Sequence, residues 1–92
     1  MKTTVEDLAR GFSQLSDPTR LGILLLLVRG PKNVTALCDS LKLKQPTTSH
    51  HLALLRMGRI VKARRNGKQV IYETDKAALK ELAAAMTSLM PR

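Results

Sequence analysis

The residues best suited to chemistry form one short series, Gln-Pro-Thr-Thr-Ser-His, at positions 45–50. Most of these side chains are small and carry hydroxyl, amide or imidazole groups that exchange hydrogen bonds. Such groups match DNA base edges and phosphate oxygens at the start of a helix, because a bulky residue there would hold the helix out of the major groove. The series therefore favours nucleic-acid recognition.

The apolar residues around this series place it on a helix. Thr48, Leu52 and Leu55 follow the i, i+4, i+7 spacing of one buried stripe. The opposite face and its flanks then carry five small or polar residues: Pro46, Thr47, Ser49, His50 and Ala53. A shorter helix is expected from about Asn33 to Leu41, joined by a tight turn, so the pair predicts a helix-turn-helix over residues 34–55.

The charge of the chain is strongly positive and unevenly distributed. The net charge is +9 and the isoelectric point is about 10.5. Between Ser40 and Tyr72 there is no acidic residue, and the basic ones are Lys42, Lys44, Arg56, Arg59, Lys62, Arg64, Arg65 and Lys68. A merely solvated surface usually mixes both signs, so this stretch favours a polyanionic partner, with nucleic acid preferred over membrane.

Two further helices are expected before the helix-turn-helix. An amphipathic helix over residues 4–15 places Val5, Leu8, Phe12 and Leu15 on one face. A second helix starts after the N-cap Asp17, with Pro18 in its first turn, and runs to about Arg29. It is apolar almost all round, which predicts central burial.

A β-hairpin and a last helix are expected after the helix-turn-helix. Residues 60–74 alternate apolar and polar side chains around Asn66-Gly67, a strong hairpin pattern. A turn on that pair would place Arg65 opposite Lys68, Ala63 opposite Val70 and Val61 opposite Tyr72, with the cations Arg64, Arg65 and Lys68 at the tip. The last helix, about 76–90 with Asp75 as cap, carries a stripe of Leu79, Leu82, Met86 and Leu89.

Composition limits the class of protein. The 92 residues, 43% of them hydrophobic, predict one globular domain over 1–92. The single Cys38 excludes an internal disulfide and fits a reducing cytosol, so a cytoplasmic location is expected. The first residues do not resemble a signal peptide, and the longest apolar run, Leu21 to Val28, is too short to span a bilayer.

Three motifs, met in order, resemble one known family. Residues 15–21 (LSDPTRL), 45–52 (QPTTSHHL) and 64–72 (RRNGKQVIY) are similar to motifs of the ArsR-type (ArsR/SmtB) bacterial transcription regulators. The resemblance implies a mainly α winged helix-turn-helix, in the order ααααββα, that dimerises through its first and last helices. It also implies binding to an imperfect inverted repeat near a promoter, commonly in repression that an inducer relieves.

Several positions depart from the family pattern. Metal-sensing members carry Cys-Val-Cys where this chain has Asn33-Val34-Thr35, and no histidine follows Asp75 on the last helix. The resemblance therefore does not carry metal sensing, and no metal or cofactor is expected. Lys42 and Arg59 replace glycines that are usual in the family, and Lys44 replaces a serine that often caps the recognition helix.

Other chemical roles are weaker interpretations of these residues. His50 and His51 are neighbours on one helix, so they diverge and cannot chelate one ion well; His50 is expected to face outward and His51 to be structural. Cys38 is better explained as a small core residue than as a redox sensor, which would need a second thiol from another chain. Ser49 and His50 also point apart, so no nucleophile and base are formed, and we expect no enzyme.

The sequence therefore predicts a dimeric, sequence-specific regulator of transcription, most simply a repressor that binds double-stranded DNA. The predicted DNA-binding residues are Lys44, Gln45, Pro46, Thr47, Ser49, His50, Arg64, Arg65 and Lys68. The predicted dimer contacts are Val5, Leu8, Phe12, Leu79, Leu82 and Met86. The alternative is a winged-helix module that binds nucleic acid without sequence preference or engages a protein. A small-molecule or protein effector is left open.

Overall fold

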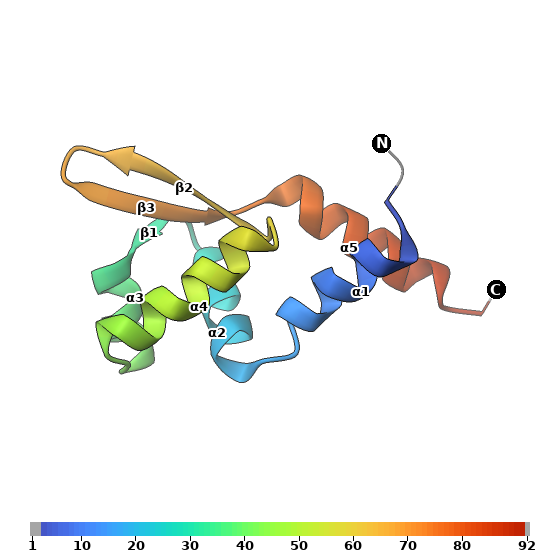
Figure 1. The fold of residues 1–92 in the computed structure, drawn as a ribbon, viewed down its shortest axis with the longest axis horizontal. Helices are drawn as coiled ribbons and strands as arrows, with labels where there is room; N and C mark the ends of the chain where they lie inside the picture. Colours follow the sequence, from blue (N-terminus) through green and yellow to red (C-terminus); the bar gives the residue numbers. More distant parts are fainter. Residues whose placement is uncertain (1–2, 92) are drawn as a thin grey trace.

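The computed structural model describes residues 3–91 and has the expected succession of elements (Figure 1). In chain order these are α1 (Val5–Gln14), α2 (Pro18–Leu27), β1 (Lys32–Asn33), α3 (Val34–Leu41), α4 (Gln45–Met57), β2 (Val61–Asn66), β3 (Gln69–Thr74) and α5 (Lys76–Ser88). The predicted fold class, a mainly α winged helix-turn-helix with one β-hairpin, is confirmed.

Four of the helices begin at a side chain that accepts a hydrogen bond from a free backbone N–H. Thr4 and Asp7 form a reciprocal capping box on α1, and Asp17 accepts from the Arg20 N–H at the start of α2. Asn33 and Asp75 cap α3 and α5 in the same way. Each such cap contributes about 1 kcal/mol to stability, which explains why these helices start where the sequence predicts.

The core lies where α2, α3 and α4 meet the base of the hairpin. Its fully buried side chains include Ile23, Leu37, Leu52 and Leu55, each 0% exposed. They come from the three helices of the helix-turn-helix region, so the same burial that stabilises the fold also fixes the position of α4. Burying one such side chain contributes about 1.5–3 kcal/mol.

The predicted central burial of α2 holds for only one of its faces. Ile23, Leu24 and Leu27 are buried, whereas Leu21, Leu25 and Val28 are exposed. The reason is that α2 packs on α3, α4 and β3, while α1 packs on α5 and leaves the outer face of α2 uncovered. The apolar residues on all sides of α2 therefore did not mean that all sides are buried within the single chain.

The hairpin forms, but its register differs from the predicted one by two residues. Asn66 pairs with Gln69, Arg65 with Val70, Ala63 with Tyr72 and Val61 with Thr74. The turn is therefore Gly67-Lys68, with a positive φ at Gly67 alone, as in turns that favour glycine at the first central position. Because the shift is even, Val61, Ala63 and Tyr72 still share one face.

A third strand was not predicted. The two-residue strand β1 pairs antiparallel with β3, with Lys32 opposite Tyr72 and Asn33 opposite Ile71, so the sheet order is β1-β3-β2. A strand of two residues has no periodicity that a sequence could show. Its pairing protects one edge of the hairpin and joins the wing to the start of α3.

Helices α1 and α5 lie side by side as an extension of the body (Figure 1). Leu8, Phe12 and Leu79 are half-buried against the core, whereas Val5 and Met86 are largely exposed. Leu82 is 6% exposed and belongs to the core of the single chain, which leaves little of its side chain for the predicted dimer contact. A Cβ at Gly11 would lie only 2.7 Å from Leu82 Cδ2, which shows how closely α1 approaches α5.

Candidate nucleic-acid interface

Helix α4 separates buried from exposed residues as the sequence predicts. Thr48, Leu52 and Leu55 are fully buried. All five predicted contact residues on the helix are exposed: Gln45, Pro46, Thr47, Ser49 and His50. The helix is thus fixed from behind by its apolar stripe, and its first two turns present hydrogen-bonding groups outward.

The start of α4 differs from the other helix starts because its N-cap residue, Lys44, makes no side-chain capping bond. The Lys44 carbonyl accepts from the Thr48 N–H at 3.1 Å, and Pro46 has no N–H to satisfy. The N–H groups of Gln45 and Thr47 are therefore left without an intrahelical partner. Together with the helix dipole and the Lys44 ammonium, they make this end of α4 favourable for a phosphate.

Two basic residues next to α4 adopt a left-handed backbone. Lys42 ends α3 at φ 55°, and Arg59 follows α4 at φ 60°. This conformation costs a non-glycine residue about 1–2 kcal/mol, which is why glycine is expected in both places. Both side chains are exposed, so the chain carries a positive charge where an uncharged glycine would be less strained.

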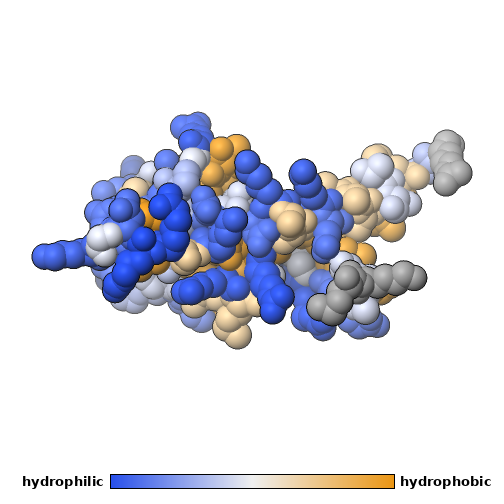
Figure 2. All heavy atoms as spheres, turned by 90° about the horizontal axis from the view of Figure 1, so that it is seen from above, coloured by the Kyte–Doolittle hydropathy of each residue, from blue (hydrophilic) through white to orange (hydrophobic). Residues whose placement is uncertain are grey.

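The wing presents cations at its tip. Arg64, Arg65 and Lys68 are exposed, and none of them forms an ion pair with another residue in the range 3–91. Lys62, further from the tip, lies 3.9 Å from Glu73 across the strands. Figure 2 shows hydrophilic side chains protruding over the wing end of the molecule. Unpaired cations on a projecting hairpin repel one another, and phosphates would relieve that repulsion.

The two neighbouring histidines have different surroundings, as predicted. His50 is exposed, whereas the His51 side chain is 16% exposed, with Nδ1 lying 3.7 Å from Asp17 Oδ2 and 3.5 Å from Arg20 Nη1. The Asp17 pKa is lowered, first because its carboxylate accepts the Arg20 backbone N–H and then because Arg20 and His51 lie nearby. His51 therefore faces the body of the protein and His50 faces solvent.

The sequence did not predict that Arg20 would lie beside His51. The two residues are 31 positions apart, and no spacing rule connects them. The only indication was that residues 15–21 and 45–52 carry two separate motifs. In the structure the two motifs are in contact, because Arg20 of the first lies beside His51 of the second.

Cys38 lies half-buried on α3 as a free thiol, which fits a packing role. Within residues 3–91 no three histidine, cysteine, aspartate or glutamate side chains gather as a metal site would require. No helix in that range is long and apolar enough to cross a membrane.

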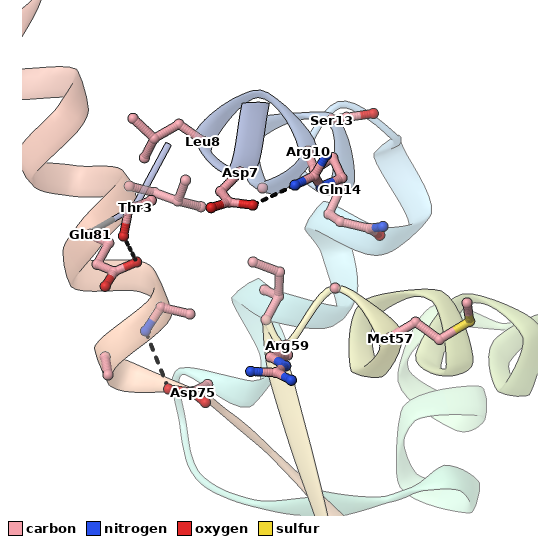
Figure 3. A pocket seen from close by; sticks show the side chains of 16 residues that line it. Thr3, Asp7, Leu8, Arg10, Ser13, Gln14, Met57, Arg59, Asp75 and Glu81 are labelled. Atoms are coloured by element: carbon pink, nitrogen blue, oxygen red, sulfur yellow. Dashed lines mark hydrogen bonds and ion pairs between the residues drawn. The ribbon is translucent and has the colours of Figure 1, made fainter. Parts of the chain in front are cut away.

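A hollow between α1, α5 and the end of α4 has charged walls (Figure 3). Its carboxylates already have partners: Asp7 binds Arg10 and caps α1, Glu81 accepts from Thr3, and Asp75 caps α5. The Thr3–Glu81 hydrogen bond joins the residue before the α1 cap to α5, and the other acids of the hollow are bound within their own helices.

Comparison with known proteins places this geometry in a family. The sequence model described as "Bacterial regulatory protein, arsR family" matches residues 17–63, which contain α2, α3, α4 and the start of the wing. An uncharacterized helix-turn-helix transcriptional regulator of Methanocaldococcus jannaschii is 41% identical over 85 residues, covering 91% of this chain and 96% of its own length. The chain belongs to the arsR family of regulatory proteins.

Solved structures agree with this family assignment. The transcriptional repressor BigR from Xylella fastidiosa is 33% identical with a TM-score of 0.73, over 95% of this chain and 90% of its own. A homodimeric winged helix-turn-helix DNA-binding domain from Mycobacterium bovis, a possible ArsR-family regulator, is 28% identical with a TM-score of 0.78, over 91% and 79%. This arsR-family chain is therefore a DNA-binding transcriptional regulator and not an enzyme.

Proposed function

We propose that this arsR-family chain is a homodimeric repressor that reads an inverted-repeat operator. Helix α4 enters the major groove with Gln45, Thr47, Ser49 and His50 toward bases and phosphates, beside Lys44 and Pro46. The wing cations Arg64, Arg65 and Lys68 bind the backbone or the minor groove. The observation that carries the proposal is the exposed polar series at the start of α4, next to the wing-tip cations Arg64, Arg65 and Lys68, which form no ion pair within residues 3–91.

The proposed dimer uses the surface of α1 and α5. Val5 on α1 is 77% exposed and Met86 on α5 is 57% exposed, and Leu8, Phe12 and Leu79 lie half-buried beside them. Large exposed apolar side chains on two adjacent helices are typical of a surface covered by a partner. The Mycobacterium bovis relative is homodimeric, which supports a second copy of this chain as that partner.

A regulator of this kind acts in the cytoplasm, where its operator is, and an effector that releases it would be a small molecule or a protein. A dimer would place its two α4 helices about one helical turn, roughly 10–11 base pairs, apart on the DNA, or a multiple of that distance.

The test is a comparison of two duplexes. The wild-type protein first selects a preferred sequence from a random library in vitro. Fluorescence anisotropy then measures its affinity for that duplex and for a scrambled one over a salt series. We expect a preference of about 10³ or more at physiological salt. Affinities that are equal on both duplexes and fall together with salt would overturn the proposal in favour of a nonspecific nucleic-acid module.

The same assay tests the role of the exposed face of α4. His50→Ala and Ser49→Ala should reduce affinity for the selected duplex more than for the scrambled one, because only base contacts depend on sequence. Equal losses on both duplexes would remove these side chains from base reading.

A further inference from the structure

The two motifs that indicate the family meet in space through one small cluster. Arg20 Nε donates to the carbonyl oxygen of Gln14 at 3.0 Å, and Arg20 Nη1 lies 3.5 Å from His51 Nδ1. Asp17 accepts from the Arg20 backbone N–H at 3.0 Å and lies 3.7 Å from His51. The cluster thus joins the end of α1, the start of α2 and the middle of α4.

This cluster supplies the polar link between α4 and the rest of the body. Within residues 3–91, the hydrogen bonds and ion pairs that join an α4 side chain to another helix all involve His51. The other anchors of α4 are apolar contacts of Leu52 and Leu55 and the buried Thr48, whose hydroxyl has no partner. Apolar packing resists separation but fixes rotation about the helix axis less strictly than a directional bond.

His51 is also adjacent to the residue that faces the DNA. His50 and His51 have ring centroids 5.6 Å apart in an edge-on arrangement. A rotation of α4 that moved His51 away from Arg20 would carry His50 and Ser49 with it, because all three belong to one rigid helix. Base contacts tolerate small displacements poorly, whereas contacts to phosphates tolerate them better.

We propose that His51 is a positioning residue: bound through Nδ1 to Arg20, whose backbone N–H donates to Asp17, it fixes the rotation of α4 so that His50 and Ser49 meet the base edges. The inference rests on the proposed function, since it assigns His51 to the specificity of that same surface. Arg20 donates to His51 Nδ1, which requires the tautomer with its proton on Nε2. Gln14 holds the guanidinium in place from the other side.

The test uses two substitutions that remove the link from opposite ends. His51→Ala removes the acceptor, and Arg20→Lys keeps the charge but cannot reach Gln14 O and His51 Nδ1 together. Each should lower the preference for the selected duplex over the scrambled one by about fivefold or more, within the range for directly coupled groups. Affinity for the scrambled duplex should change little.

Matched controls separate positioning from general damage. His51→Asn places an amide near the position of Nδ1 and should restore most of the preference. Arg29→Lys makes the same substitution as Arg20→Lys on an exposed loop residue and should have no effect. Thermal unfolding of each variant identifies any that fail to fold. If His51→Ala fails to fold, Arg20→Lys carries the test, because it leaves His51 in place and removes only the contacts of the Arg20 guanidinium.

The double variant gives the decisive outcome. If His51 and Arg20 act through one link, His51→Ala with Arg20→Lys should lose no more preference than either change alone. Additive losses, or an unchanged preference in folded His51→Ala, would overturn the proposal. A wild-type protein without any preference would instead overturn the proposed function, so the two failures are distinguishable.

Discussion

At the scale of single residues, the basic stretch between Ser40 and Tyr72 carries a conflict between backbone conformation and charge. Arg59 adopts φ 60° directly after Gly58, in a region where its Cβ is sterically unfavourable. Glycine would relieve this strain but would remove a cation from the stretch that lacks acids. The arrangement is expected when the positive charge of this stretch is worth more to the protein than local stability.

This conflict leads to a prediction for two matched substitutions. Arg59→Gly should raise the free energy of unfolding by about 1 kcal/mol, which corresponds to roughly 4–8 °C in melting temperature for a domain of this size. Arg59→Ala loses the same charge but keeps the strained backbone, so it should show no such gain. Thermal unfolding by circular dichroism measures both, and equal melting temperatures for the two variants would contradict the explanation.

At the scale of elements, the sequence predicted type and order better than exact pairing. The caps Asp17 and Asp75 and the stripe of α4 are local features, so their consequences were readable from neighbouring residues. The hairpin register depends on the choice of turn residues, and Asn66-Gly67 and Gly67-Lys68 compete within one short stretch. The exposed face of α2 depends on where α1 packs, which no local pattern determines.

The exposed contact series was predicted for the same local reason. The period of 3.6 residues that buries Thr48 and Leu52 necessarily turns Ser49 and His50 outward. The link between Arg20 and His51 was beyond such reasoning, because it joins two helices whose crossing is set by the whole core.

The wing carries a prediction about salt. Arg65→Ala should weaken binding to the selected and scrambled duplexes alike and reduce the salt slope of log affinity by about one, because one phosphate contact is lost. Lys80→Ala on α5 is the matched control: it removes the same charge from an exposed residue outside the proposed DNA surface, and its slope should equal that of the wild type. A wild-type slope for Arg65→Ala would remove this side chain from the phosphate contacts.

At the scale of the whole molecule, the single chain is elongated, with extents of 46 × 25 × 22 Å. The body that holds α4 and the wing lies toward one end, and α1 with α5 forms the other (Figure 1). The core lies in the body, so the outer sides of α1 and α5 keep apolar groups such as Val5, Met86 and Leu89 in solvent. A second copy packed there would cover these apolar groups and place two recognition helices on one DNA duplex.

In the proposed dimer, affinity for the operator depends on dimerisation. Val5→Asp combined with Met86→Asp places two charges in the proposed apolar contact, where burying them is costly, so sedimentation velocity should show a monomer. Binding to a duplex with two half-sites should fall by about 10²-fold or more, because the second half-site is no longer bound intramolecularly. Binding to one half-site should be unchanged, since α4 and the wing are intact.

Val70→Asp on the hairpin, another exposed apolar residue, is the control and should leave the dimer whole. If the double variant remains dimeric, the contact lies elsewhere, and the uncovered face of α2 with Leu25 becomes the surface to examine.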